Sequence, residues 1–116
     1  MKEWRPLVKL QIAGKGKFIG PGCRDLLLGI RECGSVRLAC ARMDMSYSKA
    51  WRILRTLETE AGFEALSRKQ GGRNGGETSL TPEGDRLLER FLAYERECGQ
   101  AVGDIFQRHF GGEAEQ

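Results

Sequence analysis

The sequence contains one histidine, His109, and lacks the side-chain sets on which most catalytic sites are built. It has no paired-carboxylate, Cys–His or Ser–His–Asp constellation, and a metal ion at His109 would have no second ligand to support it. His109 is therefore interpreted as a surface residue near a frayed C-terminus. We expect neither an enzyme nor a cofactor.

Cysteine-rich patterns and long apolar runs are also missing. The four cysteines, Cys23, Cys33, Cys40 and Cys98, show no C-x-x-C spacing and are interpreted as small buried hydrophobes rather than a zinc site or a disulfide framework. No apolar run is long enough to cross a membrane, and the opening MKEWRPLVKL lacks the apolar stretch of a signal peptide. We expect a cytoplasmic protein with no membrane partner.

What the sequence does contain is positive charge concentrated in two acid-free stretches. With 116 residues it forms one domain, and its net charge is only +3. The cations of the two stretches exceed that whole excess; they are Lys49, Arg52 and Arg55 within residues 46–57, and Arg68, Lys69 and Arg73 within residues 67–76. Concentrated charge of this kind is typical of a nucleic-acid-binding face.

The first stretch, SYSKAWRILRTLE (46–58), has the periodicity of a helix. Its apolar residues lie three or four apart and predict one buried stripe; they are Tyr47, Ala50, Trp51, Leu54 and Leu57. Trp51 is assigned to the core, with packing against a neighbouring hairpin or contact with a sugar as alternatives. The cations on the opposite face either bind an anionic partner or form an ordinary solvated face.

Signals before this helix predict a helix-turn-helix. The stripe that runs from Cys23 to Cys33 ends at Gly34, and Ser35 can cap a helix SVRLACARM, whose Ala39 suits a close approach of backbones. Asp44 tolerates a positive φ in a very short turn, and Ser46 caps the helix that follows. The second helix of such a pair enters the major groove.

Two hairpins are predicted as well. LVKLQI (7–12) alternates as a strand, FIG returns as a second one, and Pro21–Gly22 ends this N-terminal hairpin. After Gly62, Leu66 and Leu80 can point inward from two strands joined by GGRNGG, as in the wing of a winged helix. An ordinary hairpin is the alternative, although it has no need for cations beside its tip.

The last predicted helix carries a seam for dimerisation. Thr81 caps it, Pro82 takes its first position, and its apolar residues recur at four-and-three spacing. The seam consists of Leu87, Phe91, Tyr94 and Cys98, continued by Ala101 and Ile105. Gly99 and Gly103 weaken the second half, where we expect a kink or a break.

The predicted fold is therefore mainly α with small β-hairpins (α+β), a winged helix-turn-helix with a long C-terminal dimerisation helix. Residues 1–80 are expected to form the DNA-binding domain with its N-terminal hairpin. Residues 81–110 form the dimerisation helix, and residues 111–116 form a disordered tail.

The motifs resemble a known family. The string TLETEAGFEALSRKQGGRNGGETSLTPEG resembles the helix–wing–helix segment of LysR-type regulators through Leu57, Glu58, Gly62, Leu66, Arg68, Leu80, Thr81, Pro82 and Gly84. The N-terminal hairpin, ECGSV, SYSKAW and the glycine-rich wing are closer still to the N-terminal domain of the ModE family of molybdate-responsive transcriptional regulators. The resemblance covers residues 7–94 and implies DNA binding and dimerisation. It departs in having Asp44 where glycine is usual, and in ending at Gln116 before any oxyanion-binding domain, so molybdate sensing by this chain is not expected.

We therefore expect a homodimeric, sequence-specific transcriptional regulator that binds double-stranded operator DNA. The base-contacting candidates are Ser48, Lys49 and Arg52, and the phosphate-contacting candidates are Ser46, Tyr47, Arg55, Arg68, Lys69 and Arg73. The alternative is a winged-helix module for protein interaction or dimerisation without DNA contact. A small-molecule effector in a pocket between the helices also stays open.

Overall fold

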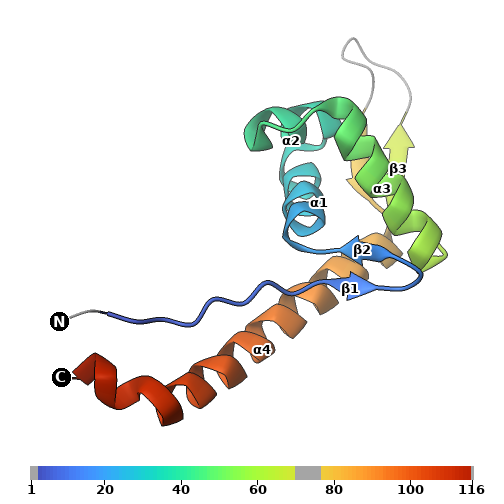
Figure 1. The fold of residues 1–116 in the computed structure, drawn as a ribbon. Helices are drawn as coiled ribbons and strands as arrows, with labels where there is room; N and C mark the ends of the chain where they lie inside the picture. The colour runs from blue at the N-terminus through green and yellow to red at the C-terminus, as the bar shows by residue number, and fades with distance from the viewer. Residues whose placement is uncertain (1–2, 70–76, 116) are drawn as a thin grey trace.

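The computed structural model describes residues 3–69 and 77–115 (Figure 1). The elements in chain order are β1 (Ile12–Ala13), β2 (Lys17–Ile19), α1 (Pro21–Cys33), α2 (Val36–Met43), α3 (Tyr47–Ala61), β3 (Leu66–Lys69), β4 (Glu77–Leu80) and α4 (Pro82–Glu115). α1 to α3 and the two hairpins form a globular part, from which α4 runs outward, giving overall extents of 60 × 29 × 21 Å (Figure 1). This order confirms the predicted winged helix-turn-helix with a long last helix.

The core forms where the apolar stripes of the helices meet. α1 contributes Leu26, Leu27 and Ile30, all fully buried, and α3 contributes Leu54 and Leu57. Burying a side chain of this size stabilises the fold by about 1.5–3 kcal/mol. The predicted stripes are therefore confirmed at these positions, and the polar faces of both helices are left for solvent or a partner.

The helix ends follow the predicted caps. The Ser35 hydroxyl accepts a hydrogen bond from the Leu38 N–H at 3.2 Å, and the Ser46 hydroxyl accepts one from the Lys49 N–H at 3.1 Å. Between them Asp44 takes φ 53°, the left-handed conformation expected of the tight turn. The two caps and the turn fix where α3 begins and which way its first turn faces.

The small residue Ala39 allows a close approach of helices, but the close neighbour is α1. A Cβ built on Gly29 would lie 3.0 Å from the Ala39 Cβ. The pairing of two small residues lets α1 and α2 pack tightly against each other.

The N-terminal hairpin is shorter than predicted. Its first strand is only Ile12–Ala13, and the expectation that residues 7–11 are also strand is wrong. Pro21–Gly22 does not end the hairpin as a turn; Pro21 takes the first position of α1, where its missing N–H costs no hydrogen bond. Ile19 is 2% exposed and anchors β2 in the core.

The wing has the two predicted strands, which form an antiparallel pair with Leu66 opposite Leu80. The Thr78 N–H donates to the Gly34 carbonyl at 2.9 Å and ties β4 to the end of α1. The loop GGRNGG, with Arg73, and the side chain of Lys69 lie outside the described residues.

α4 begins as predicted, with the Thr81 hydroxyl accepting a hydrogen bond from the Gly84 N–H at 3.0 Å. Of the kink or break predicted at Gly99 or Gly103, a break is absent: the helix runs without interruption over Pro82–Glu115, and neither glycine takes a positive φ. The predicted disordered tail is also corrected, since helix continues past residue 110 to Glu115. In the part of the chain that the structure describes, no helix combines the length and the apolar character needed to cross a membrane.

Candidate nucleic-acid interface

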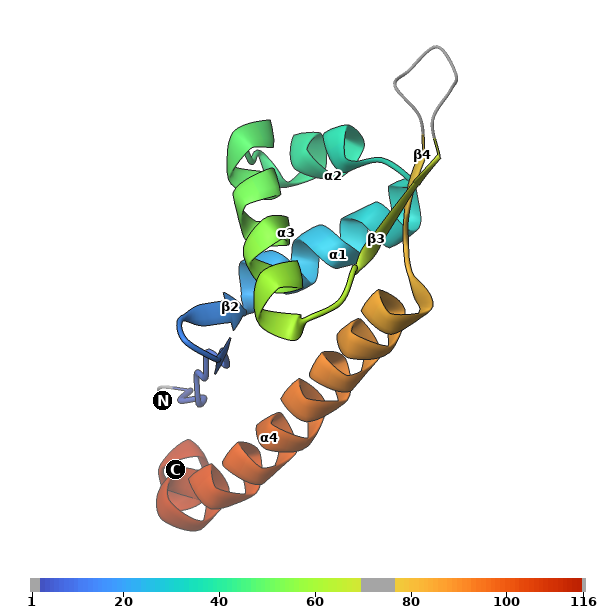
Figure 2. The same ribbon diagram turned by 90° about the vertical axis from the view of Figure 1, so that its right-hand side faces the viewer.

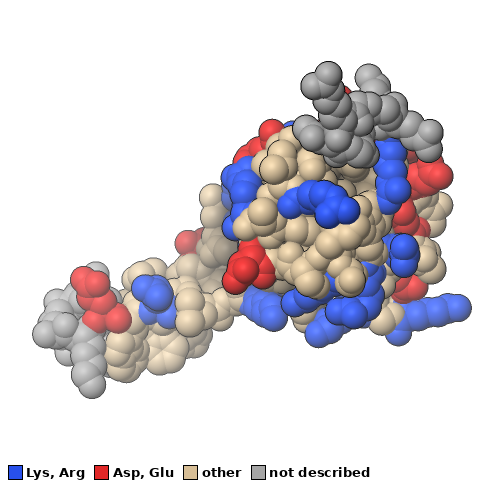
Figure 3. All heavy atoms as spheres, turned by 90° about the horizontal axis from the view of Figure 1, so that it is seen from above, with Lys and Arg blue, Asp and Glu red and all other residues tan. Residues whose placement is uncertain are grey.

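One face of α3 is polar, exposed and free of acids over its first three turns. Its core-facing residues Ala50, Leu54 and Leu57 are fully buried, which turns the remaining positions outward. The outward residues are Ser46, Ser48, Lys49, Arg52 and Arg55. Seen from above, Lys and Arg side chains gather along one edge of the globular part with few acids among them (Figure 3).

Four arginines outside α3, Arg24, Arg31, Arg42 and Arg86, are paired with neighbouring acids. Arg31 of α1 bonds Glu89 at 2.7 Å and Asp85 at 3.0 Å, and these hydrogen bonds raise the pKa of its guanidinium. Arg42 of α2 pairs with Glu32 at 2.9 Å. Among the described residues, Lys49, Arg52 and Arg55 form no ion pair. The positive charge on this face of α3 is therefore not neutralised by ion pairs among the described residues and is available to an anionic partner.

Two acids near the end of α3 are engaged by backbone N–H groups instead. Glu58 accepts hydrogen bonds from the N–H of Ala65 at 2.8 Å and of Leu66 at 3.3 Å, at the base of the wing. Glu60 accepts one from the N–H of Lys15 at 2.7 Å, in the turn of the N-terminal hairpin. These carboxylates hold the two hairpins against α3. The hairpins lie on opposite sides of this helix (Figure 2).

A cation–π contact between Arg68 and Trp51 joins the wing to α3. The Arg68 guanidinium lies 3.9 Å from the centroid of the Trp51 ring, a cation–π contact worth about 0.5–1 kcal/mol at an exposed site. Trp51 is half-buried against the core, so the indole fits the alternative of packing against the wing as well as the core assignment. Arg68 is thereby held close to the exposed face of α3.

Tyr47 is not part of the buried stripe. It is 42% exposed, because the first turn of α3 projects beyond the core, and this corrects the prediction from spacing. The Arg37 guanidinium of α2 lies 4.4 Å from its ring centroid. Arg37 is a cation of this surface that was not predicted from the sequence, although its place two residues after the cap Ser35 indicated an outward position.

The predicted dimerisation residues differ in how far the structure exposes them. Phe91 is 1% exposed and lies in the domain's own core with Leu88, so its side chain does not face a partner as expected. Tyr94 is 43% exposed, whereas Leu87 and Cys98 are half-buried. Only the outer side of the seam, continued by Ile105 at 46% exposure, is available to a second chain.

Comparison with known proteins agrees with this geometry. Residues 25–85 match the lysR family of bacterial regulatory helix-turn-helix proteins. The chain is 38% identical over 89 residues to the transcriptional regulator ModE of Haemophilus influenzae, which covers 77% of this chain and 34% of that protein. It is 34% identical over 83 residues to the molybdenum transport protein ModE of Azotobacter vinelandii, covering 72% and 31%. It is 30% identical over 102 residues to the molybdenum-pterin-binding protein MopA of Rhodobacter capsulatus, covering 85% and 38%. The chain thus spans about a third of the length of these curated relatives.

Proposed function

The chain belongs to the lysR family of bacterial regulatory helix-turn-helix proteins, and from this premise we propose that it binds double-stranded DNA sequence-specifically and regulates transcription. The main support for the proposal is the exposed face of α3. Among the described residues its cations Lys49, Arg52 and Arg55 form no ion pair, whereas Arg31 of α1 and Arg42 of α2 are paired with acids.

Base contacts fall to the first turns of α3. The beginning of a recognition helix reaches deepest into the major groove, and Ser48, Lys49 and Arg52 lie there, exposed. An arginine at this place pairs most naturally with the O6 and N7 atoms of guanine, in a contact worth about 1–3 kcal/mol of discrimination.

Phosphate contacts surround this centre. Ser46, Tyr47 and Arg55 flank the base-reading positions on α3, and Arg68 extends the surface onto the wing. Lys69 and Arg73 are assigned the same role from the sequence. Such contacts supply affinity and salt dependence but little sequence information.

We propose further that the chain binds DNA as a homodimer through α4. The 34-residue helix runs outward from the globular part. It carries the exposed apolar side chain of Tyr94 near its middle and those of Ile105 and Phe110 in its outer half. The N-terminal segment follows this half, with the Trp4 and Phe110 rings 5.8 Å apart edge to face (Figure 1). A second copy of α4 would cover these side chains and present a second recognition helix to the other half of an operator.

The test of DNA binding is selection of duplexes from a random pool by three forms of the chain. The unmodified chain is compared with Lys49→Ala/Arg52→Ala and with Arg90→Ala/Arg96→Ala, which removes the same charge from exposed positions of α4. Light scattering first establishes that all three share one oligomeric state. We expect enrichment of a motif by the unmodified chain and the α4 variant, and its loss with the α3 variant. Failure of the unmodified chain to retain any duplex would favour a protein-interaction module.

A further inference from the structure

We propose that the N-terminal hairpin is a further DNA-contacting element beside α3 and the wing: with α3 it forms a cationic groove that binds a phosphate group of the DNA backbone on the side away from the wing. The proposal deepens the proposed function and rests on it. It adds Lys9 and Lys17, which lie outside both charge clusters that the sequence singled out, to Lys49 and Arg52 of the first cluster.

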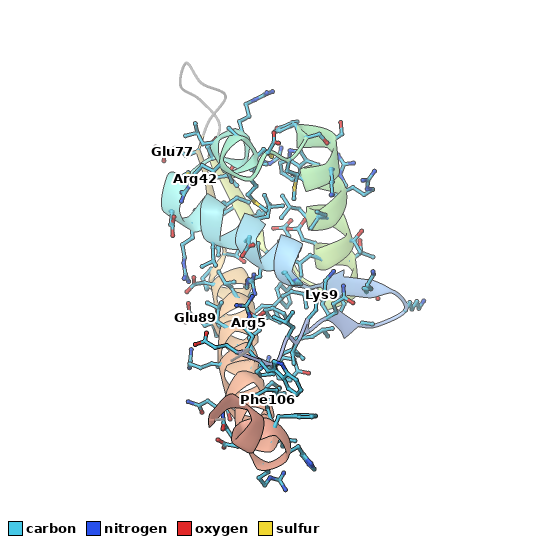
Figure 4. All side chains as sticks on the ribbon, turned by 60° about the vertical axis from the view of Figure 1, so that its left-hand side comes forward. Arg5, Lys9, Arg42, Glu77, Glu89 and Phe106 are labelled. Carbon is cyan, nitrogen blue, oxygen red and sulfur yellow. The ribbon has the colours of Figure 1, made fainter. Side chains whose placement is uncertain are left out.

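The groove lies between the hairpin, the start of α1 and the exposed face of α3, with a volume of about 530 Å³. Four cations line it: Lys9 and Lys17 come from the hairpin and the segment before it, and Lys49 and Arg52 come from α3. No carboxylate is among its lining residues in the described part of the chain. Figure 4 shows Lys9 at the base of the hairpin.

The hairpin and the wing flank α3 on different sides. Lys49, Arg52, Ile53 and Thr56 border the hairpin groove, whereas Trp51, Arg55 and Glu58 border a separate groove beside the wing. At about 3.6 residues per turn, the centres of these two sets lie roughly 150° apart around the helix. A duplex seated on the face between them would run its backbone past both hairpins.

The hairpin is held in place rather than free to swing. Its turn is fixed to α3 by the 2.7 Å hydrogen bond from the Lys15 N–H to Glu60, and β2 is anchored by the buried Ile19. Gly14 leaves room for that carboxylate, since a Cβ there would lie 2.5 Å from its Oε1. The backbone that carries Lys17 is therefore ordered before a ligand arrives, which lowers the entropic cost of binding.

The chemistry of the groove favours a phosphodiester of a duplex over a small organic ligand. Pockets for small molecules are concave and mostly apolar, with few polar groups. Here four of the thirteen lining residues are cations and none is a carboxylate, and two of the cations, Lys49 and Arg52, belong to the helix proposed to enter the major groove. With α3 in the major groove, a phosphate of the DNA backbone at the edge of that groove would lie next to Lys9 and Lys17.

The experiment measures duplex affinity against salt concentration for the full chain and for Lys9→Ala/Lys17→Ala. Both lysines are exposed, so the variant is expected to fold. Each phosphate contact contributes about 0.9 to the slope of log K against log salt. Loss of one phosphate contact from each protomer of the proposed dimer should therefore lower the slope by up to about 1.8. The decrease in affinity should be the same on selected and on random duplexes, because phosphates carry no sequence information.

Lys9→Arg/Lys17→Arg should retain the slope, and Arg90→Ala/Arg96→Ala should leave it unchanged. An unchanged slope for Lys9→Ala/Lys17→Ala, with binding still abolished in Lys49→Ala/Arg52→Ala, would overturn the hairpin contact and leave the proposed function standing. Submillimolar binding of inorganic phosphate that requires Lys9 and Lys17, again without a change in slope, would show a small-anion site instead. If the unmodified chain binds no duplex, both proposals fail together.

Discussion

Gly84 is the position where a single methyl group should do most harm, because the wing and α4 meet there at backbone distance. A Cβ at Gly84 would lie 2.3 Å from the Ala65 carbonyl oxygen and 3.0 Å from the Ala65 Cα. That carbonyl is already fixed, since it accepts a hydrogen bond from the Thr81 N–H at 2.9 Å. Relief therefore requires the base of the wing to move away from α4.

The expected cost of Gly84→Ala follows from two opposing effects. Forcing an extra carbon into a packed site typically costs about 1–3 kcal/mol, and contact with backbone rather than a flexible side chain favours the upper part of that range. Alanine's helix propensity returns up to about 1 kcal/mol. We expect a net decrease of about 1–2 kcal/mol in the free energy of unfolding.

The assay is urea unfolding followed by circular dichroism, with Gly99→Ala as the matched control. Gly99 lies in the same helix, and a Cβ there meets nothing within 4 Å, so the control should gain up to about 1 kcal/mol. The two variants thus carry the same substitution and should change stability in opposite directions. A Gly84→Ala protein as stable as the unmodified chain would refute the tight contact between the wing and α4.

Three further predictions concern the wing, the dimer and the cysteines. Replacing Arg68, Lys69 and Arg73 together with Ala should lower the salt slope of DNA binding by up to about 0.9 for each phosphate that the wing no longer neutralises, and an unchanged slope would mean that the wing stays off the DNA. Tyr94→Glu/Ile105→Glu should give a folded monomer in light scattering and should weaken operator binding, whereas Gln100→Glu, at another exposed position of α4, should stay dimeric. An unmodified chain that is monomeric at tens of micromolar would contradict the dimer. Burial raises the pKa of the Cys23 thiol from 9.0 to about 12, so the folded protein should resist alkylation at Cys23 at pH 8. The free energy of unfolding should fall as the pH rises from 9 towards 12, because only the unfolded thiol ionises in that range. Rapid alkylation of Cys23 in the folded protein, measured by mass spectrometry, would contradict this burial.

The features predicted correctly from the sequence are those decided within a few residues. The caps at Ser35 and Ser46 and the left-handed turn at Asp44 depend on local hydrogen bonds and local backbone conformation. The paired spacing of Leu66 and Leu80 about a glycine-rich loop is local in the same sense. Each of these could be recognised without knowing how the helices pack.

The features that were missed depend on packing between distant segments. The bond from Lys15 to Glu60 joins residues 45 positions apart, and no spacing rule places the hairpin beside α3. The heptad-like seam of α4 was visible, but which of its members face the core depends on where α4 crosses α1. That crossing buries Phe91 and leaves Tyr94 exposed. The continuous helix past Gly99 likewise shows that one residue of low helix propensity does not end a long helix.

Arg52→Ala is the substitution that decides whether α3 reads bases in the major groove. The measurement is the affinity of the unmodified chain and of the variant for a duplex selected by the chain and for a duplex of random sequence. We expect binding to weaken by about 1–3 kcal/mol on the selected duplex and by much less on the random one. An equal weakening on both would show that Arg52 contacts only phosphate. Unchanged affinity for both would contradict the placement of α3 in the groove.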